Sequence, residues 1–446
     1  MSKEKILFSR IFVLIIITFF ILFFIICKQV NFGEHKPIQN PNRFNGQKIK
    51  FLVTIPQARA AKAIADWFTE ETKAVVQITE IGYDETLKKT IDDINSNNPK
   101  YDILIIWYPE LGTLVKKEAI IDLTSWIEEN KQILQPEDFI PSIYNPYTLQ
   151  NGKRWAIPFD GDTHILFYRK SLLAKYKLSP PETWDDYLNV SRTITEKEKA
   201  NGIYGSAIMA YKVPVLILSS FLNRVGGYGG QLLTSDGKPS LDTPEVLAAL
   251  SALIEHSKYA LPSPLETSFE VSRDAFLSGR VAMVEQWTDI GVMAEDSSES
   301  TIRGDWGAIQ MPKGSGEKGR HAPALNAGYA LGISAKSPNL ELAKEFLLFA
   351  TRPDTMAKYN LINGGTDPTR ISILTSESYR NFAPKVSEAA QAALQNATPW
   401  ATVPRSTEMM EILTENIISA MQNRIPPDEA LAKTQKRWME ILRKLE

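Results

Sequence analysis

The sequence predicts an α/β protein with two lobes. Its 446 residues exceed the length that one hydrophobic core usually serves, so two domains are expected. Hydrophobic residues make up 43% and charged residues 23% of the chain, as in ordinary globular proteins. From residue 48 onward, apolar runs typical of buried strands alternate with segments of helical periodicity. This alternation indicates a parallel sheet covered by helices.

The first lobe opens with three predicted strands separated by helices. The strands are expected at residues 48–54, 75–79 and 102–107, and the helices at residues 56–72, at residues 83–94 and from Pro109. Ligands of such sheets bind beyond the carboxyl ends of the strands. Trp107 and Tyr108, at the end of the third strand, are therefore expected at the edge of a cleft. The alternative is that Trp107 belongs to the core.

An acidic corner follows between two further strands. Residues 155–162 and 164–168 are apolar runs, and Asp160 and Asp162 lie at the end of the first run. Carboxylates at such a corner suit contact with a polar ligand better than burial in a core. A polar binding site is therefore expected near this corner.

Thr183 with Asp185 can cap the helix that follows this corner region. Residues 205–300 are predicted to be mainly helical. The glycine-rich run 226–230 fits neither of the usual phosphate-binding patterns, so a turn is expected there. Further elements are expected in this order: strands at residues 305–312 and 326–334, a helix at 340–350 with Ser337 as its N-cap, a break at 363–368, and helices at 406–421 and from 427.

Charge and cysteine content exclude several classes of function. The formal net charge is −2, with 50 basic and 52 acidic residues, so neither nucleic acid nor an anionic membrane surface is expected as a partner. Cys27 is the only cysteine, and the four histidines lie far apart without helical metal-ligand spacing. We therefore expect no disulfide, no metal site and no cofactor.

The N-terminus carries an apolar run at residues 11–27, preceded by Lys3, Lys5 and Arg10. At ~1.5 Å per residue this run spans roughly 25 Å, which is long for a signal peptide and short for a spanning helix. No small residues suitable for cleavage follow it, which favours an uncleaved membrane anchor. The preceding positive charge places the globular part outside the cytoplasm. Residues 31–45 are expected to form a tether.

The stretch at residues 151–187 resembles the extracellular solute-binding proteins of family 1, the maltose- and trehalose-binding-protein-like receptors of sugar ABC importers. The matching residues are Gly152, Lys153, Pro158, Asp162, Phe167, Tyr168, Arg169, Lys170, Pro181, Thr183, Trp184 and Asp185. Residues 276–289 resemble a family strand after which an aromatic side chain stacks on sugar, and residues 337–349 resemble a helix of maltose-binding-like proteins. The resemblance extends from about Lys48 to the C-terminus.

This resemblance implies a two-lobed periplasmic-binding-protein fold, type II-like, with three crossings between the lobes near Asp162, near residues 329–333 and near residues 364–368. Residues 1–45 would form the cytoplasmic stub, anchor and tether. Residues 46–162 and 331–364 would form the N-terminal lobe, and residues 163–330 and 365–446 the C-terminal lobe.

Trp287 is the leading candidate for the sugar-stacking side chain, and Asp162 matches a ligand-contacting aspartate of the family. Core packing for Tyr329 and a surface ion pair for Arg405 remain alternatives. The complete expected ligand-binding set is Trp107, Tyr108, Asp160, Asp162, Trp287, Asp289, Tyr329, Gly364, Arg370 and Arg405.

The implied function is the capture of a neutral sugar for an ABC importer, without catalysis. Its partners would be permease subunits in the membrane, and the protein would be a monomer at the periplasmic face of the cytoplasmic membrane. A disaccharide or a glucosylated compatible solute such as glucosylglycerol, trehalose or sucrose is expected, with maltose disfavoured because Met409 and Met410 replace an aromatic side chain. The alternatives are a glycoside hydrolase using Asp160 and Asp162, and a solute sensor with a signalling partner.

Overall fold

A computed structural model describes residues 43–82, 85–325, 327–362 and 366–444 of the chain. The predicted membrane segment at residues 11–27, most of the tether and Cys27 lie outside the described residues. Among the helices that are described, none combines the length and the apolar character needed to cross a membrane.

The first lobe is built on a five-stranded sheet with the strand order β2-β1-β3-β12-β6. Its strands are β1 (Lys48–Thr54), β2 (Val75–Ile81), β3 (Ile103–Trp107), β6 (Ile157–Asp160) and β12 (Tyr329–Ile333). Strand β1 pairs in parallel with β2 and β3, which confirms the alternation predicted for this part of the chain. Strand β12 adds an antiparallel neighbour to both β3 and β6, so the complete sheet is mixed.

The second lobe is built on a four-stranded sheet with the order β10-β7-β9-β8. Its strands are β7 (His164–Arg169), β8 (Tyr204–Ala207), β9 (Val281–Trp287) and β10 (Trp306–Ile309). Strand β7 pairs antiparallel with β9 and β10, whereas β8 pairs in parallel with β9. Two-stranded ribbons add β11 (Ala324–Leu325) with β13 (Thr398–Pro399), and β4 (Leu149–Gln150) with β5 (Lys153–Arg154).

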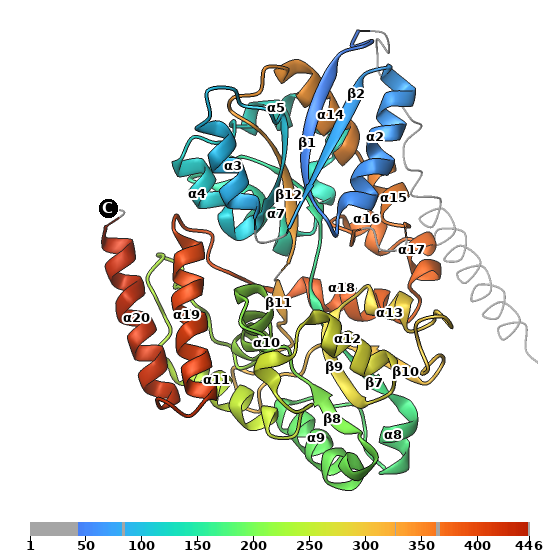
Figure 1. Cartoon of the computed structure of the whole chain (residues 1–446), viewed down its shortest axis with the longest axis vertical. Helices are drawn as coiled ribbons and strands as arrows, with labels where there is room; N and C mark the ends of the chain where they lie inside the picture. The colour runs from blue at the N-terminus through green and yellow to red at the C-terminus, as the bar shows by residue number, and fades with distance from the viewer. Residues whose placement is uncertain (1–42, 83–84, 326, 363–365, 445–446) are drawn as a thin grey trace, which may run out of the picture. The chain divides into compact units, whose positions relative to one another are not determined.

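Helices cover both sheets (Figure 1). Those before β6 are α2 (Ala58–Thr72), α3 (Thr86–Ile94), α4 (Leu111–Lys116), α5 (Thr124–Glu129), α6 (Lys131–Leu134) and α7 (Pro141–Thr148). Those between β7 and β10 are α8 (Lys170–Lys175), α9 (Trp184–Glu198), α10 (Pro214–Gly227), α11 (Pro244–Ser257), α12 (Phe269–Leu277) and α13 (Ile290–Met293). Those after β12 are α14 (Leu340–Thr351), α15 (Pro353–Tyr359), α16 (Ile371–Leu374), α17 (Glu377–Phe382), α18 (Ser387–Gln395), α19 (Ser406–Met421) and α20 (Pro427–Arg443).

Aromatic side chains join helices to sheets in both lobes. In the first lobe, Phe346 of α14 makes edge contacts with Phe51 of β1 and Phe68 of α2 at ring-centroid distances of 5.6 and 5.2 Å. In the second, Phe167 of β7 packs against Phe276 of α12 and Trp306 of β10. The apolar periodicity of the sequence therefore corresponds to helix faces packed on both sheets, and one large hydrophobic cluster includes Leu52 of the first sheet and Phe167 of the second.

Two local predictions need correction. Thr183 does cap α9, but its reciprocal partner is Asp186 rather than Asp185, because the side chain at the third helical position is the one that reaches back to the N-cap amide. The turn expected at residues 226–230 is present at Tyr228 and Gly229, whereas Gly226 and Gly227 are the last residues of α10. A Cβ at Gly226 would collide with the Ala322 carbonyl oxygen, so close packing requires glycine here.

The chain passes between the sheets at three places. Residues 161–163 join β6 to β7, and the chain returns to the first sheet between β11 and β12. It leaves again between α15, which packs on α2, and α18, which packs on β7 and β10. Residues 329–333, expected to form the second crossing, are strand β12 itself, because their apolar side chains are buried in the first sheet.

Candidate functional site

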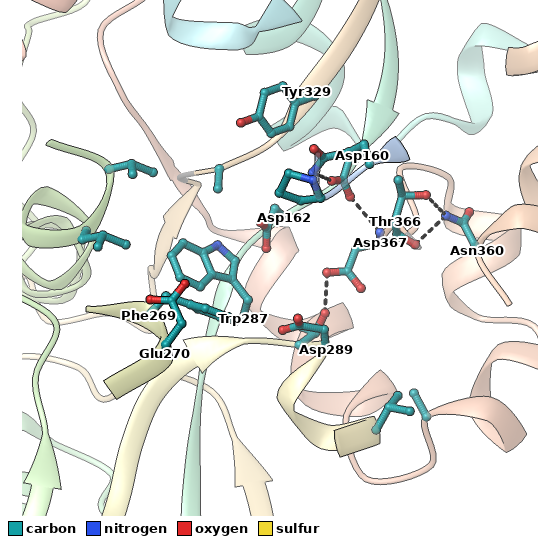
Figure 2. A pocket seen from close by; sticks show the side chains of 18 of the residues that line it. Asp160, Asp162, Phe269, Glu270, Trp287, Asp289, Tyr329, Asn360, Thr366 and Asp367 are labelled. Atoms are coloured by element: carbon teal, nitrogen blue, oxygen red, sulfur yellow. Dashed lines mark hydrogen bonds between the residues drawn. The ribbon is translucent and has the colours of Figure 1, made fainter. Parts of the chain in front are cut away.

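A cavity of about 730 Å³ lies where the ends of the two sheets meet (Figure 2). The first lobe contributes the turn before α2, the end of β6 and the start of β12, and the second contributes the end of β9 and the start of α12. Its lining residues are Pro56, Gln57, Asp160, Asp162, Tyr211, Val215, Leu216, Glu266, Ser268, Phe269, Glu270, Trp287, Thr288, Asp289, Val292, Ala327, Tyr329, Asn360, Ile362, Thr366, Asp367, Tyr379, Phe382 and Ala383.

A chain of hydrogen bonds connects the two lobes behind the cavity. Gln57 Nε2 donates to Asp160 Oδ2 at 2.8 Å, and the Asp367 backbone amide donates to Asp160 Oδ1 at 2.7 Å. Asp367 in turn accepts from Thr288 Oγ1 at 2.5 Å and from the Tyr379 hydroxyl at 3.3 Å. Both carboxyl groups are therefore engaged in holding the crossing segments together (Figure 2).

Close backbone packing reinforces this junction. The Gly161 amide donates to the Asp367 carbonyl oxygen at 3.0 Å. A Cβ at position 161 would collide with the Pro368 carbonyl oxygen, so only glycine permits the approach of the first and last crossings.

Two other carboxyl groups have oxygens without partners. Asp162 Oδ1 and Asp289 Oδ1 are buried, and neither makes a hydrogen bond within the described part of the chain. Buried polar atoms are nearly always satisfied in folded proteins. Both residues line the cavity and are partly exposed, so their carboxyl groups are positioned to accept hydrogen bonds from a bound molecule, whereas the Oδ1 atoms themselves are enclosed by protein.

Burial and mutual repulsion disturb the acid–base behaviour of all four aspartates. Burial raises the pKa of Asp289 to about 7, and the charge of Asp367 adds to this effect. Burial followed by the charges of Asp160, Asp367 and Asp289 raises the pKa of Asp162 well above its ordinary value. The pKa values of Asp160 and Asp367 are raised for the same reasons.

Aromatic side chains line the cavity beside the aspartates. Trp287 is 8% exposed and lines the cavity, while its ring contacts His164 at 4.6 Å and Phe269 at 5.5 Å. Tyr329, 5% exposed, also lines the cavity and lies next to Asp160 in the sheet. Each ring is thus packed into the protein and also forms part of the cavity wall.

Four residues of the expected binding set lie outside this lining. Trp107 is half-buried and makes an edge contact with Trp400. Tyr108 is fully buried, stacks on Tyr147 at 4.5 Å and accepts a hydrogen bond from the Trp400 amide at 2.8 Å. Both rings therefore serve packing next to the first sheet in this conformation.

The two expected arginines also make structural contacts. The guanidinium group of Arg370 is fully buried and donates to the carbonyl oxygens of Leu134, Gln135 and Thr351. Arg405 precedes α19 and forms an ion pair with Glu408 three residues later. Gly364 lies outside the described residues.

The part of the chain that is described contains no group of three or more histidine, cysteine, aspartate or glutamate side chains arranged to hold a metal ion.

Comparison with known proteins identifies the family. Residues 54–357 match the profile of the bacterial extracellular solute-binding proteins. The chain belongs to this family. The resemblance predicted from the sequence is thereby confirmed, as is the expectation of a binding protein rather than an enzyme. Membership of an extracellular family places the binding domain outside the cytoplasm.

Two relatives illustrate the range of this family. A probable amino-acid ABC transporter periplasmic-binding protein of Sinorhizobium fredii is 23% identical over 423 residues, which cover 93% of each chain. A multiple sugar-binding protein of Streptococcus mutans is 22% identical over 325 residues, covering 63% of this binding protein and 71% of the relative.

Solved structures share the two-lobed fold. A solute-binding protein of Agrobacterium radiobacter in complex with ribitol has a TM-score of 0.78 at 22% identity, with 89% of this binding protein and 99% of that chain covered. A maltose-bound protein of T. maritima has a TM-score of 0.76 at 24% identity, with 88% and 100% covered.

Sequence reasoning missed much of the lining of this binding protein. The missed residues include Gln57, Glu266, Phe269, Glu270, Thr288, Asn360, Thr366, Asp367 and Tyr379. Asp367 lay within the predicted break at residues 363–368, and its position after a run of glycines was a usable signal. The other residues come from segments with no local feature that separates them from ordinary surface loops.

Proposed function

We propose that this protein captures a small polyhydroxylated solute, a sugar or a sugar alcohol, between its lobes and delivers it to an ABC permease in the membrane. The observation that carries this proposal is the combination of aromatic walls and buried carboxylate oxygens in one cavity of about 730 Å³. Carboxylates accept hydrogen bonds from neighbouring hydroxyl groups, and aromatic faces pack against the C–H faces of sugars.

Lobe closure is the second part of the proposal. The cavity takes its lining from both lobes, and the chain crosses between them through short segments. A ligand that contacts both lobes favours the closed form by its differential affinity, and a change from mostly open to mostly closed requires about 5 kcal/mol. Several hydrogen bonds and a stacked ring can provide that amount. The closed form would be the one that the permease recognises.

Thermal-shift measurements on the purified protein test the ligand class. Sugars and sugar alcohols that bind only the folded state should raise the melting temperature in a concentration-dependent way. Trp287→Ala should reduce this shift, and small-angle scattering with a saturating ligand should give a smaller radius of gyration. If no polyhydroxylated compound stabilises the protein, the proposal fails.

The sequence predicts a neutral disaccharide or a glucosylated compatible solute as the ligand, and these are the first compounds to screen. With such a ligand, the physiological role would be the import of an osmoprotectant. Glucosylglycerol, trehalose and sucrose belong in the panel. Maltose belongs there too, since Met409 and Met410 are buried in α19, away from the cavity lining, and give no ground for excluding it. A simple amino acid fits less well, because none of the described lining residues is a lysine or an arginine that could pair with its carboxylate.

A further inference from the structure

The cavity carries an unusual excess of negative charge. Six acidic side chains line it, namely Asp160, Asp162, Glu266, Glu270, Asp289 and Asp367. None of the described lining residues is a lysine, an arginine or a histidine. Arg273 lies outside the lining, over the ring of Phe269 and ion-paired with Asp274 at 2.8 Å, and its charge only partly offsets the raised pKa of Asp289. The lining therefore offers no positive charge of its own to the cluster.

The four aspartates differ in what they do. Asp160 and Asp367 receive hydrogen bonds from the protein and hold the crossings together. The buried Oδ1 atoms of Asp162 and Asp289 have no partner within the described residues. Asp162 and Asp289 are therefore the two lining aspartates whose carboxyl groups the described protein donors leave least satisfied.

Strand register explains why the two unpartnered carboxyl groups belong together. His164 of β7 pairs with Trp287 of β9 in an antiparallel ladder. Asp162 precedes His164 by two residues and Asp289 follows Trp287 by two, so both side chains lie at the same end of this strand pair. Figure 2 draws them in the same part of the cavity as Trp287.

A neutral sugar would satisfy the hydrogen bonds of these carboxyl groups, but it would not stabilise them in their ionised form. Burying an ionised carboxylate is costly unless an opposite charge accompanies it. An ammonium group supplies both hydrogen-bond donors and positive charge, and an aromatic face such as that of Trp287 attracts cations as well. An ion without a carbon skeleton is not favoured, because the described acids are not arranged as a metal site.

We propose that the ligand is a polyhydroxylated amine, an amino sugar or an amino alditol, whose protonated amine is held between Asp162 and Asp289 while its carbon skeleton packs on Trp287. This inference rests on the proposed function and gives its ligand a charge. The proposed ligand is charged, whereas the sequence predicted a neutral one. The sequence does not reveal that Asp289 and Asp367 lie close to Asp160 and Asp162.

Calorimetry with matched charged and neutral ligands tests whether the site prefers a protonated amine. The full chain, purified in detergent, is titrated at pH 7 with chitobiose bearing free amines, with its N,N′-diacetylated form and with cellobiose. These disaccharides differ only in the substituent at C2 of each ring. Sorbitol and 1-amino-1-deoxysorbitol form a second pair. We expect the free amine to bind at least tenfold more tightly than its hydroxyl and acetamido counterparts in one or both series.

Variants distinguish the contribution of the aspartate charges to ligand affinity from that of the other lining residues. Asp162→Asn and Asp289→Asn should reduce the preference for the amine to less than threefold. Trp287→Ala should weaken the amine and hydroxyl ligands alike, and Asp296→Asn, outside the cavity, should change nothing. Equal or tighter binding of the neutral member in both series would overturn the inference while leaving the proposed function intact. An absence of binding by every compound, the neutral panel included, would overturn both.

Discussion

Replacing Asp289 by asparagine should stabilise the unliganded protein, increasingly as the pH rises from about 4 to about 7. The pKa of Asp289 is raised from 3.8 to about 7, first by burial and then by the charge of Asp367. A carboxyl group with a raised pKa contributes stability that is fully present below its unfolded pKa, near 4, and is lost as the pH rises through about 7. At pH 8 the native protein therefore holds an unfavourable buried charge that asparagine lacks.

The size of this effect follows from the pKa difference. Each pKa unit corresponds to about 1.4 kcal/mol, so a carboxyl group titrating alone would lose about 4 kcal/mol of stability between pH 4 and pH 8. Asp289 interacts with Asp367, so part of this cost is shared between the two groups. We therefore expect Asp289→Asn to raise the free energy of unfolding by about 1–4 kcal/mol at pH 8 and by roughly a quarter of that amount at pH 4.5.

Urea denaturation of the wild type and the variant between pH 4.5 and pH 8.5 measures this difference. Asp296→Asn is the matched control, because the pKa shift of Asp296 has the opposite direction: hydrogen bonds from Ser298 lower the pKa of Asp296. That contribution is present above pH 4 and lost at acidic pH, so the control should gain no stability at pH 8. An increment for Asp289→Asn that is the same at pH 4.5 and pH 8 would refute the electrostatic reasoning.

Three further predictions concern single side chains. Trp287→Ala should weaken ligand binding about tenfold or more, since a stacked and buried ring contributes about 1–3 kcal/mol; an unchanged dissociation constant in calorimetry would remove Trp287 from the site. Thr183→Ala should lower the free energy of unfolding by about 1 kcal/mol through loss of the cap of α9, and an unchanged urea midpoint would contradict that role. Arg370→Met should cost about 3–5 kcal/mol by leaving three buried carbonyl groups without their donor, whereas ligand affinity of the folded protein should persist; lost affinity with unchanged stability would instead return Arg370 to the binding site.

The sequence predicted the strands and helices well where local periodicity determines them. Strand β1 and helix α19 occupy the predicted residues 48–54 and 406–421 because their apolar positions repeat with the period of the element they form. The glycines at the end of α10 were misassigned, since their helical conformation depends on close packing against residues almost a hundred positions away. Tertiary contacts of this kind leave no mark on local composition.

The candidate site was predictable only in part for a related reason. Asp160, Asp162 and Trp287 flank strands, and strand ends carry a local signal. The local sequence does not determine the direction in which the side chains of Arg370 and Arg405 point, and both contact partners within the protein. Asp367 becomes a neighbour of Asp160 only through the packing of the last crossing on the first.

The arrangement of the aspartates joins stability, closure and binding in one place. Asp160 and Asp367 bind donors from both lobes and so hold the crossings in register, at the cost of concentrating charge beside Asp162 and Asp289. A ligand that places a donor or a positive charge there lowers this electrostatic cost, and its contacts with the lining of the first lobe add to the gain when the lobes close around it. Repulsion among the buried carboxyl groups of the unliganded site would then increase the difference in ligand affinity between the open and closed forms. That difference determines how far binding shifts the populations of the two forms.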